Sequence, residues 1–188
     1  CTITLTGVSM LSKHNTGLIV VDIQGNLAKQ VHASSAFLDQ CATLIQGAKC
    51  LDLPVVVLEQ LPNKLGPTDA KLAAHLGAFT PIIKSTFNAC EEPEFVERVR
   101  SFKVDTWLVC GIEAHICVYQ TVLGLLDLDF HVELVSDCVS SRKLSNAELG
   151  IHRAEASGAS VTSVEMCLYE LVKDASSPEF LPILNLIR

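Results

Sequence analysis

The stretch Gly17-Leu-Ile-Val-Val-Asp-Ile23 decides the fold class of this chain. It is a continuous apolar run, rich in β-branched residues, with a charge only near its end, as expected of a strand buried on both faces of a parallel sheet. Other apolar runs, later in the chain, predict further strands at 55–58, 80–84, 106–112, 130–135 and 160–163. Amphipathic segments between them predict helices at 33–50, 69–76, 93–101, 114–127, 145–157 and 164–172. This alternation indicates one α/β domain with a mostly parallel sheet.

The order of the strands follows from the handedness of their connections. Right-handed crossovers favour the order 3-2-1-4-5-6, a Rossmann-like sheet inside a three-layer α/β/α sandwich. Ligands of such sheets bind beyond the carboxyl ends of the strands, where the order reverses, here between strands one and four. The whole chain, 1–188, is assigned to this domain, with an N-terminal extension at 1–13 and an apolar C-terminal segment at 178–188. Ser145 and Glu148 fit a capping box at the start of one helix.

Composition excludes several classes of protein. The chain has 188 residues, 49% of them hydrophobic and 19% charged, which argues against disorder. Its net charge is −7, with no long basic run, so we expect no nucleic-acid partner. No apolar stretch reaches 18 residues, which argues against a membrane span. Neither GxGxxG nor GxxxxGK[ST] occurs, and no cofactor is expected.

Eight cysteines are present, and no two of them form a CxxC motif. Zinc ribbons and thioredoxin-type redox sites therefore lose their main support. Most of the cysteines lie in apolar runs, where a free cysteine behaves as a small buried hydrophobe. With no signal-peptide pattern at the N-terminus, this usage predicts reduced thiols and a cytoplasmic location.

Three reactive side chains fall at the predicted carboxyl ends of strands or just beyond them. Asp22 closes the first strand, Lys84 closes the third, and Cys117 lies where the fourth strand passes into its helix. A lysine ammonium and a helix N-terminus both favour a thiolate, and an aspartate can accept the thiol proton. The three residues together suit nucleophilic attack on an acyl carbon, giving a thioester that water then cleaves.

Each of these residues also has a purely structural interpretation. Asp22 would accept backbone N–H groups at a strand end, Lys84 would extend to solvent, and Cys117 would pack under its helix. Their position at one edge of one sheet favours the chemical interpretation. His115 lies two residues before Cys117, a helical spacing at which side chains do not meet, so it is assigned to a pocket rim or an interface.

Four segments resemble the isochorismatase-like cysteine hydrolases in their order and separation. They are VVDIQ, the EQ of VLEQLP, IIKSTF and GIEAHICV, of which the last is the most specific. The resemblance covers about residues 14–172. The EQLPNKLGPT run at 59–68 looks like the uncharacterised branch that includes YcaC-type proteins. That branch is sometimes labelled ribonuclease-like, a label that the charge of this chain does not support.

The resemblance implies a catalytic triad of Cys117 as nucleophile, Asp22 as general base and Lys84 as electrostatic support. It also implies a cis peptide between Ile112 and Glu113, an oxyanion hole made by the backbone N–H groups of Glu113 and Cys117, and Gln60 as an amide facing the substrate. The reaction implied is hydrolysis of a small amide or carbamoyl compound. Homo-oligomers are usual in the family, and the apolar segment at 178–188 fits a subunit contact.

Differences between this sequence and better-known members of the family restrict the reactions that we expect of it. Nicotinamidases hold a metal with an Asp-x-His after the second strand, where this chain has Glu59-Gln60-Leu61, so no metal site is expected. Leu27 stands where they stack a phenylalanine on the pyridine ring. True isochorismatases lack the cysteine. Two alternatives stay open: a vinyl-ether hydrolase that uses Asp22 without the thiol, and a catalytically silent binding or assembly protein with the same pocket.

Overall fold

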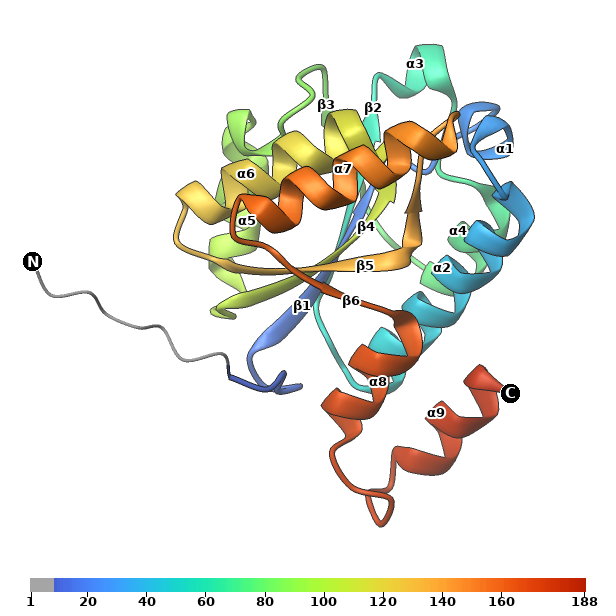
Figure 1. Cartoon of the computed structure of the whole chain (residues 1–188), viewed down its shortest axis with the longest axis vertical. Helices are drawn as coiled ribbons and strands as arrows, with labels where there is room; N and C mark the ends of the chain where they lie inside the picture. Colours follow the sequence, from blue (N-terminus) through green and yellow to red (C-terminus); the bar gives the residue numbers. More distant parts are fainter. Residues whose placement is uncertain (1–8) are drawn as a thin grey trace, which may run out of the picture.

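The computed structural model describes residues 9–188, and its centre is a six-stranded sheet (Figure 1). All neighbouring strands run parallel, in the order β3-β2-β1-β4-β5-β6. The predicted fold class and strand order are therefore confirmed. The strands are β1 (Thr16–Val21), β2 (Val55–Gln60), β3 (Ile82–Lys84), β4 (Thr106–Ile112), β5 (His131–Ser140) and β6 (Ser160–Thr162).

Helices cover both faces of the sheet, which makes three layers (Figure 1). One face carries α2 (Ser34–Cys50), α4 (Ala70–Leu76), α8 (Val164–Val172) and α9 (Phe180–Ile187). The other carries α5 (Pro93–Ser101), α6 (Tyr119–Asp127) and α7 (Leu144–Ala156). Shorter turns lie in the connections: α1 (Leu27–Gln30), α3 (Pro62–Leu65), a 3-10 turn (Ala89–Glu91) and a π-helical turn (Ala114–Val118).

Alternation along the strands divides the apolar interior into two cores. In β4, Trp107 and Val109 enter the core under α5, α6 and α7, whereas Leu108 and Cys110 enter the core under α2 and α8. All four side chains are fully buried. A strand buried on both faces has no polar face, and this is why the sequence of β4 is apolar without interruption.

Strand β5 is longer than the predicted 130–135 and includes Asp137. The register between β4 and β5 shifts between Val109 and Gly111, so the pairing resumes after an irregularity and reaches Ser140. The Asp137 carboxylate accepts a hydrogen bond from the N–H of Val164 at 3.0 Å, at the start of α8. Polar residues that resemble a turn thus belong to a bulged strand that anchors the next helix.

The predicted capping box of α7 is wrong. The helix begins at Leu144 with Lys143 as its N-cap, and no side chain caps it. Ser145 therefore lies within the first turn, two positions too late to accept the orphan N–H groups as a cap. At the other end, Gly158 follows the C-cap Ser157 with φ +116°, a conformation that only glycine adopts freely.

The two ends of the described chain pack against α8 and its surroundings. Helix α9 packs on α2 and α8 with Ile183 fully buried and Leu181 exposed, so part of the apolar C-terminal segment is used within the chain. Leu11 is buried, and its N–H donates to Glu170 on α8 at 3.0 Å. Residues 1–8 of the predicted N-terminal extension, with Cys1, lie outside the described residues.

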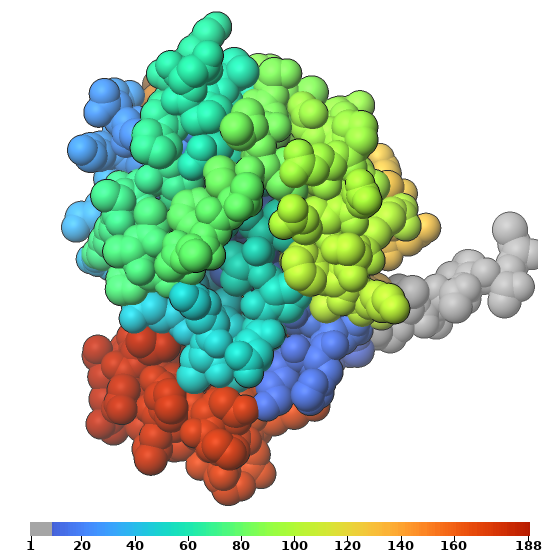
Figure 2. All heavy atoms as spheres, turned by 180° about the vertical axis from the view of Figure 1, so that it is seen from behind, coloured from blue at the N-terminus to red at the C-terminus, as the bar shows by residue number. Residues whose placement is uncertain are grey.

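The reverse side of the molecule presents the β3 edge of the sheet (Figure 2). Helices α4, in green, and α5, in yellow-green, stand on either side of this edge, and the red C-terminal helices lie at the lower end. Across residues 9–188, no helix has the length and apolar character needed to cross a bilayer.

Candidate active site

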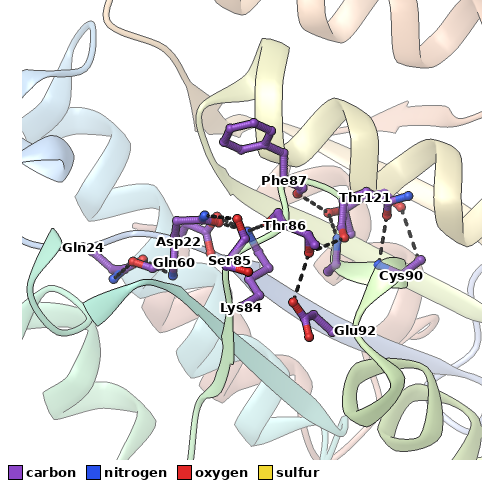
Figure 3. A network of polar contacts seen from close by, with 12 residues as sticks. Asp22, Gln24, Gln60, Lys84, Ser85, Thr86, Phe87, Cys90, Glu92 and Thr121 are labelled. Atoms are coloured by element: carbon purple, nitrogen blue, oxygen red, sulfur yellow. Dashed lines mark hydrogen bonds and ion pairs between the residues drawn. The ribbon is translucent and has the colours of Figure 1, made fainter. Parts of the chain in front are cut away.

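The carboxyl ends of four parallel strands bring the predicted reactive residues to one edge of the sheet. Asp22 follows β1 directly, with φ 52°, which turns the chain away from the strand direction. Gln60 is the last residue of β2, which runs two residues further than predicted, and Lys84 is the last residue of β3. Cys117 lies in the π-helical turn after β4. The side chains of Asp22, Gln60 and Lys84 converge in Figure 3.

Lys84 and Asp22 form a buried ion pair. Lys84 Nζ lies 2.7 Å from Asp22 Oδ2, and the residues are 1% and 2% exposed. The ammonium also donates to Gln60 Oε1 at 2.5 Å and to the carbonyl oxygen of Thr86 at 3.0 Å. An ammonium has three N–H donors, so all of those on Lys84 have acceptors inside the protein. This satisfies the requirement that a buried charge be paired and hydrogen-bonded.

Gln60 is held in place by residues that the sequence analysis did not select. Its backbone N–H donates to Gln24 Oε1 at 2.7 Å, and Gln24 Nε2 donates to the Gln60 carbonyl at 3.1 Å and to that of Gly66 at 2.7 Å. The Gln60 side-chain amide donates to the Ser85 carbonyl at 2.8 Å. Gln24 thus links the ends of β1 and β2 to the loop that carries α3. In the sequence, Gln24 is marked only as the last residue of the VVDIQ segment, two positions after Asp22.

Glu59 fixes the far end of the same loop. Its Oε1 accepts hydrogen bonds from the N–H of Thr68 at 2.8 Å and from the Thr68 hydroxyl at 2.6 Å, and both residues are buried. Gly25 N–H donates to the Pro67 carbonyl at 3.2 Å, close to this contact. The segment 61–68 is therefore attached at both ends to the strands that carry the ion pair.

The thiol of Cys117 is only 8% exposed, and its surroundings keep it protonated. Burial and the negative charge of Asp22 raise its pKa to about 12, against the opposing effect of Lys84. Desolvation and the Asp22 carboxylate thus oppose the resting thiolate that a helix N-terminus and a lysine favour.

Asp22 is the base available to this thiol. Burial raises the pKa of the Asp22 carboxyl above its ordinary 3.8, although the charge of Lys84 and hydrogen bonds with Lys84 and Cys117 lower it. Within residues 9–188, Asp22 Oδ1 has no hydrogen-bond partner of regular geometry. A desolvated carboxylate with a free oxygen beside a protonated thiol is the arrangement of a general base with its nucleophile.

A cavity of about 140 Å³ opens onto these groups. Its polar lining comes from Asp22, Gln60, Glu113 and Cys117, whereas Lys84 lies behind Asp22 and does not line it. The rest of the lining is apolar: Leu27, Leu65, Phe87, Ile112 and Ile116. Of the four side chains expected at the site, those of Asp22, Gln60 and Cys117 therefore line one cavity, and that of Lys84 lies behind them.

The backbone at the end of β4 forms one wall of this cavity. The peptide bond between Ile112 and Glu113 is cis. The Glu113 carboxylate accepts hydrogen bonds from the backbone N–H and the Nε of Arg142, both at 3.0 Å. Burial raises the pKa of Glu113, but the hydrogen bonds and charge of Arg142 lower it further, so the net shift is downward. Glu113 is thus an ionised side chain with its own cationic partner.

His115 contacts a different part of the structure. Its Nδ1 lies 2.9 Å from the hydroxyl oxygen of Ser141, which follows β5. Within residues 9–188, no three His, Cys, Asp or Glu side chains are grouped so as to hold a metal ion.

Comparison with known proteins identifies relatives over most of the chain. The isochorismatase domain family matches residues 16–166. The "Secreted isochorismatase effector Isc1" of Phytophthora sojae is 34% identical over 184 residues, which cover 95% of this chain and 87% of that protein.

Solved structures share the fold. The MAR1 ribonuclease of Caenorhabditis elegans superimposes with a TM-score of 0.89 and 32% identity, covering 95% of this chain and 92% of the other. YcaC of Escherichia coli, described as an octameric hydrolase of unknown specificity, superimposes with a TM-score of 0.87 and 20% identity, covering 97% and 96%.

Proposed function

Because the chain belongs to the isochorismatase domain family, we propose that it is a cysteine hydrolase acting on a small amide or carbamoyl compound. The observation that carries the proposal is the Cys117 thiol beside the buried Asp22 carboxylate, in a cavity of about 140 Å³. The base is held by Lys84 at 2.7 Å, at the switch point where sheets of this topology bind their ligands.

The first half of the reaction forms a thioester. Cys117 Sγ attacks the substrate acyl carbon while Asp22 takes the thiol proton. The carbonyl oxygen becomes an oxyanion, which the backbone N–H groups of Glu113 and Cys117 stabilise. When the carbon–nitrogen bond breaks, the nitrogen leaves with the proton from Asp22. The amine departs as a neutral molecule, and the acyl group stays on the sulfur.

The second half releases the acid. Water attacks the thioester carbon, and Asp22 takes a proton from it. The carbon–sulfur bond breaks, and the thiol is restored as the sulfur takes up that proton. Lys84 keeps Asp22 oriented throughout and offsets the cost of its ionised form. Gln60 holds Lys84 through its amide oxygen. Within residues 9–188 its amide nitrogen makes a single hydrogen bond, to Ser85, so one N–H is available for the substrate.

The two alternatives receive less support. A vinyl-ether hydrolase would have no use for a thiol whose proton interacts with Asp22. A silent binding protein would have no use for a desolvated carboxylate placed beside a thiol. A ribonuclease activity, as the name of the Caenorhabditis elegans relative states for that protein, fits poorly with a net charge of −7 and a cavity lined by two carboxylates.

Two further properties belong to the proposal. We expect a homo-oligomer, in keeping with the octamer of Escherichia coli YcaC, and Leu181 is the exposed apolar residue of α9 available for a contact. We also expect a cytoplasmic location, since all seven cysteines of residues 9–188 are free, although the Phytophthora sojae relative is named as secreted.

The deciding experiment is a screen of small primary amides and carbamoyl compounds for ammonia release. Cys117→Ala removes the nucleophile, and Cys50→Ala is the matched control because it removes a partly exposed thiol far from the site. Turnover that Cys117→Ala abolishes and Cys50→Ala retains supports the proposal. Turnover that persists in Cys117→Ala favours the vinyl-ether type of mechanism, in which Asp22 acts without the thiol.

A further inference from the structure

Within the described chain, the two ionisable carboxyl residues that line the cavity have no cationic neighbour in the lining itself. Two of its lining residues, Asp22 and Glu113, carry carboxylates. Among residues 9–188, no lysine, arginine or histidine lines it. A substrate anion placed here would lose its hydration and meet like charges, which is costly when no cation compensates.

The two nearby cations are already engaged. Lys84 is fully buried and donates to Asp22, Gln60 and Thr86, so it has no N–H left for a substrate. Arg142 gives its Nε to Glu113, and its side chain is 59% exposed outside the lining. Pairing either one with a substrate carboxylate would require it to leave a carboxylate of the protein.

The walls restrict the size and polarity of the acyl group. Leu27 from α1 and Leu65 from α3 face the cavity, together with Phe87, Ile112 and Ile116. A volume of about 140 Å³ is small beside the roughly 300–1,000 Å³ of pockets for drug-sized ligands. Walls of this kind suit a short hydrocarbon group next to the reacting carbonyl.

We propose that the site selects uncharged acyl compounds with a compact apolar acyl group and rejects carboxylates and phosphate esters. Resting on the proposed function, this inference names the substrate class. The polar groups of the cavity then serve the reacting carbon, and the apolar walls hold the rest of the substrate. Discrimination arises because nothing in the cavity can neutralise a second charge.

The test compares two alkylating reagents that differ only in charge. Iodoacetamide is neutral and iodoacetate is an anion of nearly the same size. Rates of Cys117 modification are measured by mass spectrometry at one pH, and their ratio is divided by the ratio for free glutathione. We expect Cys117 to prefer iodoacetamide by about tenfold or more beyond glutathione, since an anion at this site loses hydration and finds no free cation in the described lining. A ratio equal to that of glutathione overturns the inference.

A matched pair of variants at Leu65 separates charge from shape. Leu65 is at the cavity wall and 36% exposed, so Leu65→Lys can extend its ammonium to the opening. We expect Leu65→Lys to remove most of the preference and Leu65→Met to retain it. If Leu65→Met changes the ratio as much as Leu65→Lys, access rather than charge sets the preference, and the inference fails.

Substrates distinguish this inference from the proposed function. Butanamide is compared with succinamate, which adds a carboxylate to a similar chain. Hydrolysis of butanamide but not of succinamate supports both proposals, and equal hydrolysis retains the function and overturns the selectivity. If neither amide is hydrolysed while the alkylation preference holds, the cavity still selects neutral compounds, and the hydrolase proposal is the one that fails.

Discussion

Two buried thiols near the end of β4 differ in what surrounds them. Cys110 lies inside the strand, fully buried in the core under α2, and its pKa is raised by a hydrogen bond with Cys41 and by burial. Cys117 lies seven residues later, and burial and Asp22 raise its pKa to about 12. A raised pKa therefore does not distinguish a candidate nucleophile from a core residue. A base within reach and a cavity in front of the sulfur do.

The same comparison applies to the other cysteines. Burial also raises the pKa of Cys138 and Cys167 to about 12, and both are fully enclosed. Neither lines the cavity that contains Cys117. Cys117 is thus expected to differ from the other cysteines in reactivity, even though the pKa values of these thiols are similar.

The largest expected effect is on catalysis, from removal of the Cys117 thiol. Cys117→Ala should lower kcat/KM by about ten-thousandfold or more, because nucleophile removal leaves only binding and oxyanion stabilisation. Cys110→Ala should leave kcat/KM within about twofold, since this sulfur lies in the core away from the cavity. Steady-state kinetics on any substrate found in the amide screen measures both. Equal losses in the two variants would remove the distinction between the thiols.

A smaller but still large effect is expected for the base. Asp22→Asn should lower kcat/KM by about a thousandfold or more, as the loss of a carboxylate that supports a nucleophile does elsewhere. Its effect on the free energy of unfolding is expected to be small, because the raised pKa of Asp22 means that its ionised form already costs free energy in the fold, which offsets the loss of the counter-ion of Lys84. Urea denaturation measures this effect. The double variant Asp22→Asn/Lys84→Met should be at least as stable as Asp22→Asn and inactive, and recovery of activity would contradict the assigned role of Asp22.

The pH dependence tests the base in the intact protein. Asp22 must be ionised to accept the thiol proton, and its pKa is raised above 3.8 by burial. The rate should therefore fall about tenfold per pH unit below that raised pKa, on the acid side of the profile. Glu113→Gln should leave this limb in place, since the pKa of Glu113 is shifted downward from 4.5. If the acid limb of the profile disappears in Glu113→Gln, the base is Glu113 and not Asp22.

The same pKa shift has a consequence for stability. Because the folded-state pKa of Asp22 is above its unfolded value, this group contributes stability that is present below pH 3.8 and lost as pH rises through the folded-state pKa. Glu113 has the opposite sign, with stability present above 4.5 and lost as pH falls through its lowered pKa. Comparing the pH dependence of unfolding in Asp22→Asn and Glu113→Gln separates the two contributions.

The smallest expected effect concerns the core thiol. Cys110→Ala should lower the free energy of unfolding by about 1 kcal/mol, the scale of one buried methylene-sized group. Urea denaturation detects this change. A cost near zero would mean that the sulfur contributes little to packing between α2 and the sheet.

The sequence was informative where a local pattern has a single structural solution. The apolar runs around Val20 and Val109 can only be buried parallel strands, and their connections lead to one strand order. That order places Asp22, Lys84 and the start of the turn holding Cys117 at one edge. The pattern failed at Ser145 and at the end of β5, where polar residues suit several local structures and long-range pairing decides among them.

What the sequence determined by itself is the fold, the edge that carries the chemistry, and the identity of the residues gathered there. Only the tertiary structure decided the state of those residues. The saturation of Lys84 by Gln60 and Thr86 and the raised pKa of the Cys117 thiol depend on contacts between separate strands. Strand formation follows from the pattern of apolar residues within a short segment. Hydrogen bonding and desolvation depend instead on which groups from distant parts of the chain meet. The local sequence does not encode the distances between those groups.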